Sequence, residues 1–200
     1  CQAYGVHAEV IKAEWGKAVK AEEIKAKLKA TKARVVFTTL CETSTGVTTD
    51  IKSIAEVVKN TEAVLVVDAI SGLGVVDLKT DAWAVDVVVS GSQKGLMLPP
   101  GLGFISISQK AWKLIDAARS PRYYFDLRAA KKAWAQSDTA FTTPVSLVVA
   151  LNAALKMLKE EGLENVFTKC RKMAESVRAA ASALGLKLYA DASCASDAIT

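Results

Sequence analysis

Short runs of aliphatic and β-branched residues alternate with longer amphipathic stretches along the first half of the chain. Alternation at period two predicts a strand in "EVIKAEW", residues 9–15, whereas "KAEEIKAKLKA", residues 20–30, has the spacing of a helix. Asp50 is placed to cap another helix, "DIKSIAEVVKN". Four further apolar runs predict strands, the first of them buried, at 34–39, 63–70, 86–92 and 101–108.

Two long amphipathic stretches follow in the second half. "PVSLVVALNAALKMLKEEG" begins with a proline, which suits a helix N-terminus, and stops at Gly162. "LENVFTKCRKMAESVRAAASALG" is a second helix that ends at Gly185. Repeated strand–helix–strand units with apolar strands indicate an α/β fold, in which helices cover both faces of a mostly parallel sheet.

Composition and charge exclude some function classes. Hydrophobic residues make up 51% of the chain and charged residues 24%, which is ordinary for a globular protein. The net charge is +5, but the basic residues are interleaved with glutamates in segments such as "KAEEIKAKLKATKAR". That mixture is typical of a solvated helix face, so we expect no nucleic-acid partner. Apolar runs of about 20 residues are lacking, so we expect no membrane partner.

The cysteines and the single histidine give no metal or redox motif. Cys1, Cys41, Cys170 and Cys194 form no CxxC pair, so we expect neither a metal site nor a disulfide framework. A reducing, cytoplasmic compartment fits this cysteine usage, and an organelle lumen stays open. His7 has no motif around it, and we interpret it as a loop residue.

Polar side chains stand where three of the predicted strands end. Asp68 closes an apolar run, which is unfavourable for a carboxylate unless it meets a cation or a hydrogen-bond donor. Residues 90–93 and then Lys94 follow the next strand, and "ETSTG" at 42–46 follows an earlier one. Ligands of such sheets bind at the carboxyl ends of the strands. We therefore expect these side chains to converge if the strands are neighbours.

An aspartate and a lysine together suit pyridoxal 5′-phosphate. The aldehyde of this cofactor forms a Schiff base with a lysine amine, and a carboxylate keeps its pyridine nitrogen protonated, so that the ring can act as an electron sink. Its phosphate needs small donors, which the Ser-Gly-Ser turn at 90–92 offers. The ordinary alternatives are a solvated surface position for Lys94 and a turn or capping role for Asp68.

Several blocks of the sequence resemble one enzyme family. "VVDAISGLG" at 66–74 and "SGSQKGLMLPPGLGFISIS" at 90–108 resemble the class V, fold-type I aminotransferases, most of all the alanine–glyoxylate and serine–glyoxylate (serine–pyruvate) aminotransferases. "ETSTGV" at 42–47, "TTPVSLVVALNAAL" at 142–155 and "EEGLEN" at 160–165 resemble further blocks of this family in order and spacing. The resemblance extends over essentially the whole chain.

The resemblance implies roles for six residues. Lys94 would form the Schiff base with pyridoxal 5′-phosphate and move the substrate proton, and Asp68 would pair with the pyridine nitrogen. The other four would contact the cofactor: Ile70 on one ring face, Gln93 at the phosphate, Ser44 near the ring hydroxyl, and Thr142 at the phosphate bound by the neighbouring subunit of a homodimer.

The resemblance also implies that the chain is part of a longer enzyme. The glycine-rich phosphate turn and the arginine that binds the substrate carboxylate are missing, and neither Arg122 nor Arg128 matches the place of that arginine. We expect residues 1–160 to form the large cofactor-binding domain without its N-terminal part. Residues 161–200 would begin the smaller, incomplete α+β domain. We interpret the aromatic residues 123–125 as core.

The activity implied is transamination of serine or alanine with glyoxylate or pyruvate as acceptor. One alternative is another class V reaction such as cysteine desulfuration, but no cysteine lies in an evident mobile loop, and Cys41 stands at a strand end. A second alternative is a non-catalytic subunit, because some relatives carry the label of a soluble hydrogenase small subunit. The four cysteines offer no cluster typical of nickel–iron or iron–sulfur ligation. We expect the 200-residue chain alone to be catalytically silent.

Overall fold

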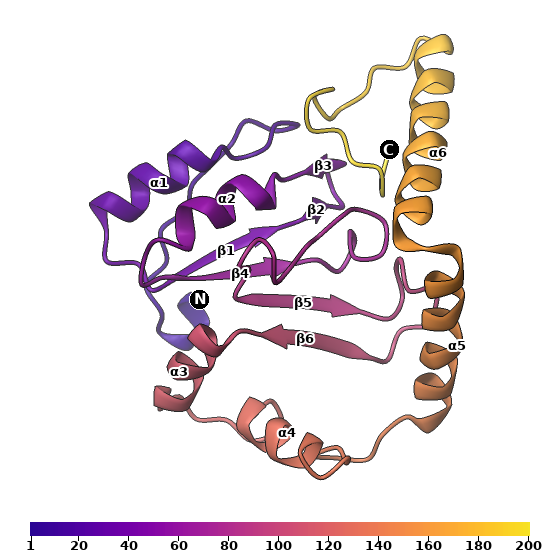
Figure 1. The fold of residues 1–200 in the computed structure, drawn as a ribbon. Coiled ribbons are helices and arrows are strands. Elements are labelled where there is room, and N and C mark those ends of the chain that lie inside the picture. The colour runs from indigo at the N-terminus through magenta and orange to yellow at the C-terminus, as the bar shows by residue number, and fades with distance from the viewer.

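The computed structural model describes residues 1–200, except the side chain of Gln2, and contains one main sheet. Its strands lie in the order β1-β4-β5-β6, and β6 alone runs antiparallel to its neighbour (Figure 1). The strands are β1 (Val35–Thr39), β4 (Val64–Asp68), β5 (Val87–Gly91) and β6 (Gly103–Ile107), and a separate hairpin is formed by β2 (Cys41–Glu42) and β3 (Val47–Thr48). The prediction of a mostly parallel sheet is confirmed.

Helices flank this sheet. They are the 3-10 helix η1 (Gln2–Tyr4), α1 (Ala21–Ala30), α2 (Ile51–Val58), α3 (Gln109–Ala117), α4 (Leu127–Trp134), α5 (Val145–Glu161) and α6 (Leu163–Ala183). The first two α-helices cover one face, α3 packs against the other, and α5 and α6 stand beside the carboxyl ends of the strands (Figure 1). Within the described residues, no helix has the length and apolar character needed to cross a membrane.

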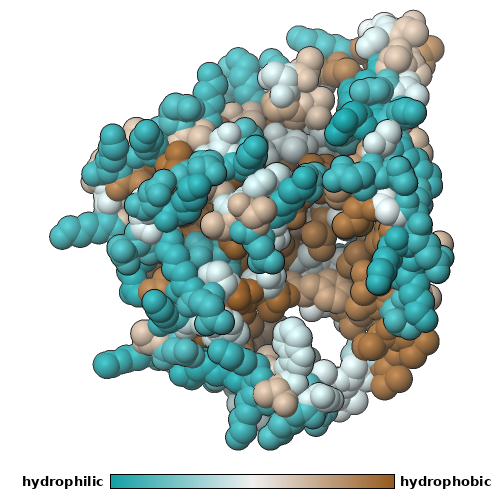
Figure 2. Space-filling view, in the orientation of Figure 1, coloured by the Kyte–Doolittle hydropathy of each residue, from teal (hydrophilic) through white to brown (hydrophobic). Residues whose placement is uncertain are grey.

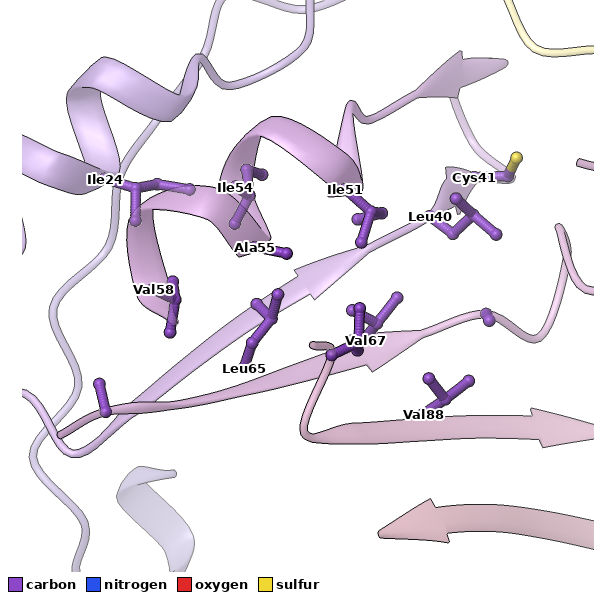
Figure 3. Close-up of a cluster of buried hydrophobic side chains, with 13 residues drawn as sticks. Ile24, Leu40, Cys41, Ile51, Ile54, Ala55, Val58, Leu65, Val67 and Val88 are labelled. Atoms are coloured by element: carbon purple, nitrogen blue, oxygen red, sulfur yellow. The ribbon is translucent and has the colours of Figure 1, made fainter. Parts of the chain in front are cut away.

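The main core lies between α2 and the sheet. Ile51, Ile54 and Val58 recur at helical spacing and face Leu65 and Val67, and each of these five side chains is at most 2% exposed (Figure 3). Burial of an aliphatic side chain of this size stabilises a fold by about 1.5–3 kcal/mol. The core therefore fixes β1 and β4 under α2, and so fixes the positions at which these strands end.

The predicted helix ends are confirmed where their chemistry is local. Asp50 caps α2, because its Oδ1 accepts a hydrogen bond from the amide of Ser53 at 3.0 Å. Pro144 is the residue before α5, and Gly162 ends that helix with a φ of 81°. A domain boundary near residue 160 stays a prediction.

Residues 9–15 are not a strand, so that prediction is wrong. The segment is irregular, and among the described residues no strand runs beside it to supply the hydrogen-bond ladder that a strand requires. Ile11 still packs against the main core, whereas Trp15 is 75% exposed. The period-two pattern therefore reflects partial burial of Ile11 and Ala13 in an irregular segment.

Two burial predictions are also wrong. The strand predicted at 34–39 exists, but it lies at an edge of the sheet, and Phe37 is 66% exposed. The aromatic residues at 123–125 are exposed rather than core, with Tyr123 at 83% and Phe125 at 87%. These rings lie between α3 and α4 and pack partly against Phe141, with 5.9 Å between the ring centroids of Tyr123 and Phe141.

A buried carboxylate ties the elements together at the amino end of the sheet. Asp86 is 5% exposed, and its Oδ2 accepts from the amide of Leu65 at 3.0 Å. Its Oδ1 accepts from the hydroxyl of Ser108 at 2.7 Å, and Lys110 Nζ lies 3.6 Å from Oδ2. Because each carboxylate oxygen has a partner, burial of this charge is compensated.

Candidate active site

The strand ends named from the sequence are neighbours in the structure. The register aligns Thr39 of β1 with Asp68 of β4, and Asp68 with Val89 of β5. Asp68 is the last residue of β4, and Lys94 follows shortly after β5 ends at Gly91. The predicted convergence of these strand ends is therefore confirmed.

The carboxylate of Asp68 is held in one orientation by its own loop. Asp68 is half-buried, and its Oδ1 accepts a hydrogen bond from the amide of Ile70 at 3.0 Å. No hydrogen bond to Oδ2 is found among the described residues. One carboxylate oxygen is thus fixed by the protein, and the other can meet a cationic or N–H group of a ligand.

Residues 92–102 form a loop, called here the Lys94 loop. It contacts the loop after Asp68 at glycine residues. A Cβ added at Gly95 would lie 2.3 Å from the carbonyl oxygen of Leu73, and one at Gly74 would lie 3.3 Å from the carbonyl oxygen of Gly95. Gly74 also has a φ of 82°, a conformation that favours glycine. A side chain at Gly95 would clash with the main chain of Leu73, so this glycine allows the Lys94 loop to lie against the loop that follows Asp68.

The turn that follows β5 separates exposed from buried polar groups. Gln93 and Lys94 are exposed, whereas Ser90 and Ser92 are buried. The hydroxyl of Ser92 donates to the carbonyl oxygen of Pro99 at 2.7 Å, and that of Ser90 lies 3.4 Å from the carbonyl oxygen of Ala69. The serine hydroxyls that the sequence suggested for a phosphate therefore serve the fold, which leaves Gln93 as the side-chain donor of this turn.

The hairpin loop at 42–46 carries Ser44 and is joined to the loop after Asp68. The amide and the hydroxyl of Ser44 both donate to Glu42 Oε1, at 2.9 Å and 2.7 Å, and these bonds lower the pKa of Glu42 below its usual range. Thr43 and Ser71 share a hydroxyl–hydroxyl hydrogen bond of 2.7 Å. Toward a cofactor, Ser44 can therefore accept a hydrogen bond. The bridge between Thr43 and Ser71 is absent from the sequence prediction, because nothing in the pattern pairs these loops.

A cavity of about 210 Å³ lies behind this hairpin loop, against the C-terminal segment. It is lined by Thr43, Ser44, Thr45, Gly46, Arg178, Leu188, Tyr189, Ala190, Ala195, Ile199 and Thr200. Arg178 donates to the carbonyl oxygen of Ser196 at 2.7 Å and to Asp197 Oδ1 at 3.3 Å. The guanidinium of Arg178 in this lining is thus already paired with the C-terminal segment.

Thr142 stands apart from the other predicted site residues. It is exposed on the segment that leads into α5, and no hydrogen bond within the described residues joins it to Lys94 or Asp68. The start of α5 nevertheless lies near the Lys94 loop, because a Cβ added at Gly101 would be 2.5 Å from Leu147 Cδ1. A role for Thr142 at a phosphate stays a prediction.

The donor set at the strand ends fits pyridoxal 5′-phosphate. It contains an exposed amine in Lys94, a carboxylate oxygen with room for a partner in Asp68, an apolar side chain in Ile70 and an exposed amide in Gln93. These are the groups that the aldehyde, the pyridine nitrogen, the ring face and the phosphate each require. Among the residues that the structure describes, no group of three or more His, Cys, Asp or Glu side chains is arranged to hold a metal ion.

The amino-acid sequence is similar to that of several known proteins. The chain is 46% identical over its full length to a protein of Anabaena cylindrica named "Soluble hydrogenase 42 kDa subunit", of which it covers 53%. It is 39% identical, over 95% of its length, to a serine–glyoxylate aminotransferase of Hyphomicrobium methylovorum, of which it covers 49%. The chain thus spans about half the length of these relatives.

The fold is also similar to that of solved aminotransferase structures. The alanine–glyoxylate aminotransferase of a Nostoc species superimposes with a TM-score of 0.93 at 28% sequence identity, over 98% of this chain and 53% of that one. The fold is therefore that of the fold-type I enzymes that bind pyridoxal phosphate. The sequence model "Aminotransferase class-V" matches residues 1–197, a range that includes the whole sheet, the strand-end loops and every helix given above. By that match the chain belongs to the class-V aminotransferase family.

Proposed function

We propose that the full-length protein is a pyridoxal phosphate-dependent transaminase that transfers the amino group of serine or alanine to glyoxylate or pyruvate. One observation carries the proposal: Asp68 ends β4, Lys94 follows the adjacent strand β5, and the loops after these two strands are in close contact at Gly74 and Gly95. The names of a serine–glyoxylate relative and an alanine–glyoxylate structural neighbour support this substrate class.

Each site residue has a task that its position permits. When bound, pyridoxal phosphate supplies an electron sink for negative charge at the α-carbon of the amino acid. Lys94 supplies the amine that binds the cofactor, and afterwards the base that takes the α-proton. The carboxylate of Asp68 favours a protonated ring nitrogen by charge attraction. Its orientation is already set by the amide of Ile70, so little reorganisation is needed.

The remaining residues bind and orient. Ile70 covers one face of the ring and excludes water there, and Ser44 accepts a hydrogen bond on the ring hydroxyl side. Gln93 donates its amide to the phosphate. These roles agree with an exposed Gln93 and a half-buried Ile70 at the same end of the sheet.

A homodimer forms part of the proposal. Val145, Val148 and Val149 of α5 are 68%, 42% and 64% exposed, and apolar side chains gather over this helix (Figure 2). A continuous apolar surface of this kind is typical of a protein interface. Thr142 stands three residues before this helix, and we propose that a second copy docks on the surface and that Thr142 contacts the phosphate bound by that copy.

Cysteine desulfuration is less well supported. Cys41 is 2% exposed, and its sulfur lies 3.4 Å from Thr48 Oγ1 and 3.3 Å from Ser196 Oγ. A buried sulfur held in this way cannot reach a substrate at the strand ends. We further propose that the hydrogenase name of the Anabaena relative denotes a protein of the same aminotransferase kind, since the chain that matches it also matches the aminotransferase family over residues 1–197.

Reductive labelling tests the proposal. The full-length protein is incubated with pyridoxal phosphate, reduced with borohydride and digested, and the labelled peptide is identified. We expect the label on Lys94 and its loss in Lys94→Ala, but not in Lys113→Ala, which changes an exposed lysine of α3. A label that maps to any other lysine contradicts the assignment.

A further inference from the structure

Ser92 is fully buried two residues before Lys94, at 0% exposure. Its amide donates to the carbonyl oxygen of Leu102 at 3.1 Å, and its carbonyl oxygen accepts from the amide of Leu98 at 3.1 Å. Its hydroxyl donates to the carbonyl oxygen of Pro99 at 2.7 Å and accepts from the amide of Leu102 at 3.2 Å. Every hydrogen-bonding group of Ser92 is therefore used to close the Lys94 loop on itself.

The Lys94 loop contains a strained backbone conformation that requires stabilising hydrogen bonds. Met97 has a φ of 61°, in the left-handed region that residues with a side chain disfavour, and its amide donates to the carbonyl oxygen of Lys94 at 2.9 Å. Backbone strain of this kind persists only where the surroundings over-determine the conformation. Leu96 and Leu98, in the middle of the loop, pack in a hydrophobic cluster with Leu158 of α5. Ser92 joins the start of the loop to its end through Pro99 and Leu102.

We propose that Ser92 is a positioning residue for Lys94. Its side-chain hydroxyl holds the two ends of the Lys94 loop together, and the closed loop keeps the lysine amine near Asp68. The inference rests on the proposed role of Lys94 as the amine that binds the cofactor. The hydroxyl itself touches no ligand, because its hydrogen is committed to Pro99 and its oxygen to Leu102. Ser92→Ala removes both bonds and leaves the two main-chain bonds of Ser92 in place.

The chain offers a matched control in Ser108. The hydroxyl of Ser108 likewise donates one hydrogen bond, to Asp86 Oδ1 at 2.7 Å, and accepts one, from the amide of Ala111 at 3.1 Å. It lies at the amino end of the sheet, away from Lys94. Ser108→Ala therefore removes the same kind of bonds and should lower the overall stability without changing the lysine.

The experiment uses full-length wild type, Ser92→Ala and Ser108→Ala. We measure the rate of borohydride-trapped labelling of Lys94 by pyridoxal phosphate, and, without cofactor, hydrogen exchange at the amides of Leu98 and Leu102. In Ser92→Ala we expect labelling to slow about tenfold and exchange at Leu102 to quicken at least tenfold, a factor equivalent to about 1.4 kcal/mol. In Ser108→Ala both should match the wild type, even where its melting temperature falls by a similar amount.

The outcomes separate the inference from the function on which it rests. If the wild type carries no label on Lys94, the proposed function fails, and this inference with it. If the wild type is labelled and Ser92→Ala is labelled at the same rate, the function stands and the role of Ser92 is refuted. If Ser92→Ala cannot be purified, the wild type in rising urea decides: labelling of Lys94 should fall together with protection of the Leu102 amide, and labelling that survives the loss of this protection refutes the role.

Discussion

Asp68→Asn separates the charge of the carboxylate from its shape. Asparagine keeps an oxygen at the position that accepts from the amide of Ile70 at 3.0 Å, so the loop after β4 should keep its conformation. An uncharged NH2 group replaces the oxygen that is free to face a ligand. The substitution therefore removes the attraction between a carboxylate and a protonated ring nitrogen while the fold remains.

The size of the effect follows from that lost attraction. A hydrogen bond to a charged group contributes about 1.5–3 kcal/mol, and two unit charges about 4 Å apart attract by about 4 kcal/mol at the effective dielectric constant of a protein surface. A loss of about 2–4 kcal/mol in the transition state corresponds to about a 30- to 1,000-fold fall in kcat. The free energy of unfolding should change by no more than about 0.5 kcal/mol.

The assay is steady-state turnover of the full-length protein with serine or alanine and glyoxylate, together with urea unfolding of each variant. Asp116→Asn makes the same chemical change at an exposed position of α3 and should leave both quantities unchanged. Near-normal turnover in Asp68→Asn would show that another group holds the ring nitrogen. A large loss of stability would show instead that the carboxylate supports the fold.

Three further predictions concern the dimer, the core and pH. Thr142→Val should weaken binding of pyridoxal phosphate by about ten- to a hundredfold in an equilibrium titration, since a hydrogen bond to a charged group is worth about 1.5–3 kcal/mol; full affinity in the variant, or in a monomeric sample, would remove this residue from the site. Ile54→Ala, at a side chain 1% exposed, should lower the free energy of unfolding by about 2–5 kcal/mol in urea, and a loss below 1 kcal/mol would contradict the packing. Hydrogen bonds from Ser44 lower the pKa of Glu42 in the folded state. These bonds therefore stabilise the fold fully at a pH above the ordinary pKa of 4.5, and this stabilisation is lost as the pH falls through the lowered pKa. Glu42→Gln should flatten that part of the stability–pH curve, and an unchanged curve would show that the bond contributes nothing.

Local chemistry made much of the fold predictable. The cap at Asp50, the proline before α5 and the glycine at its end are signals that act within a few residues, and each lies where the sequence placed it. The placement of Asp68 at a strand end beside the strand before Lys94 was also predictable, because parallel strands with apolar sequences have few possible arrangements.

Features that depend on distant partners were not predictable. Residues 9–15 alternate like a strand, yet no described strand pairs with them, and alternation alone cannot supply a partner. The aromatic residues at 123–125 have core-like composition but lie on the surface. The commitment of Ser92 to Pro99 and Leu102 depends on how an irregular loop closes, which no periodic pattern records.

The carboxylate of Asp86 gives the two ends of the sheet different tolerances to change. Its oxygens accept from the main-chain amide of Leu65 in β4 and from the hydroxyl of Ser108 before α3, so substitution of Asp86 or Ser108 should alter how firmly the amino end of the sheet is held while leaving the strand-end loops as they are. A mutant library selected only for heat resistance should therefore collect its changes around Asp86. A library selected for a new amino donor should collect them at the opposite end, and changes from the two libraries should combine with nearly additive effects, because the sites share no side-chain partners.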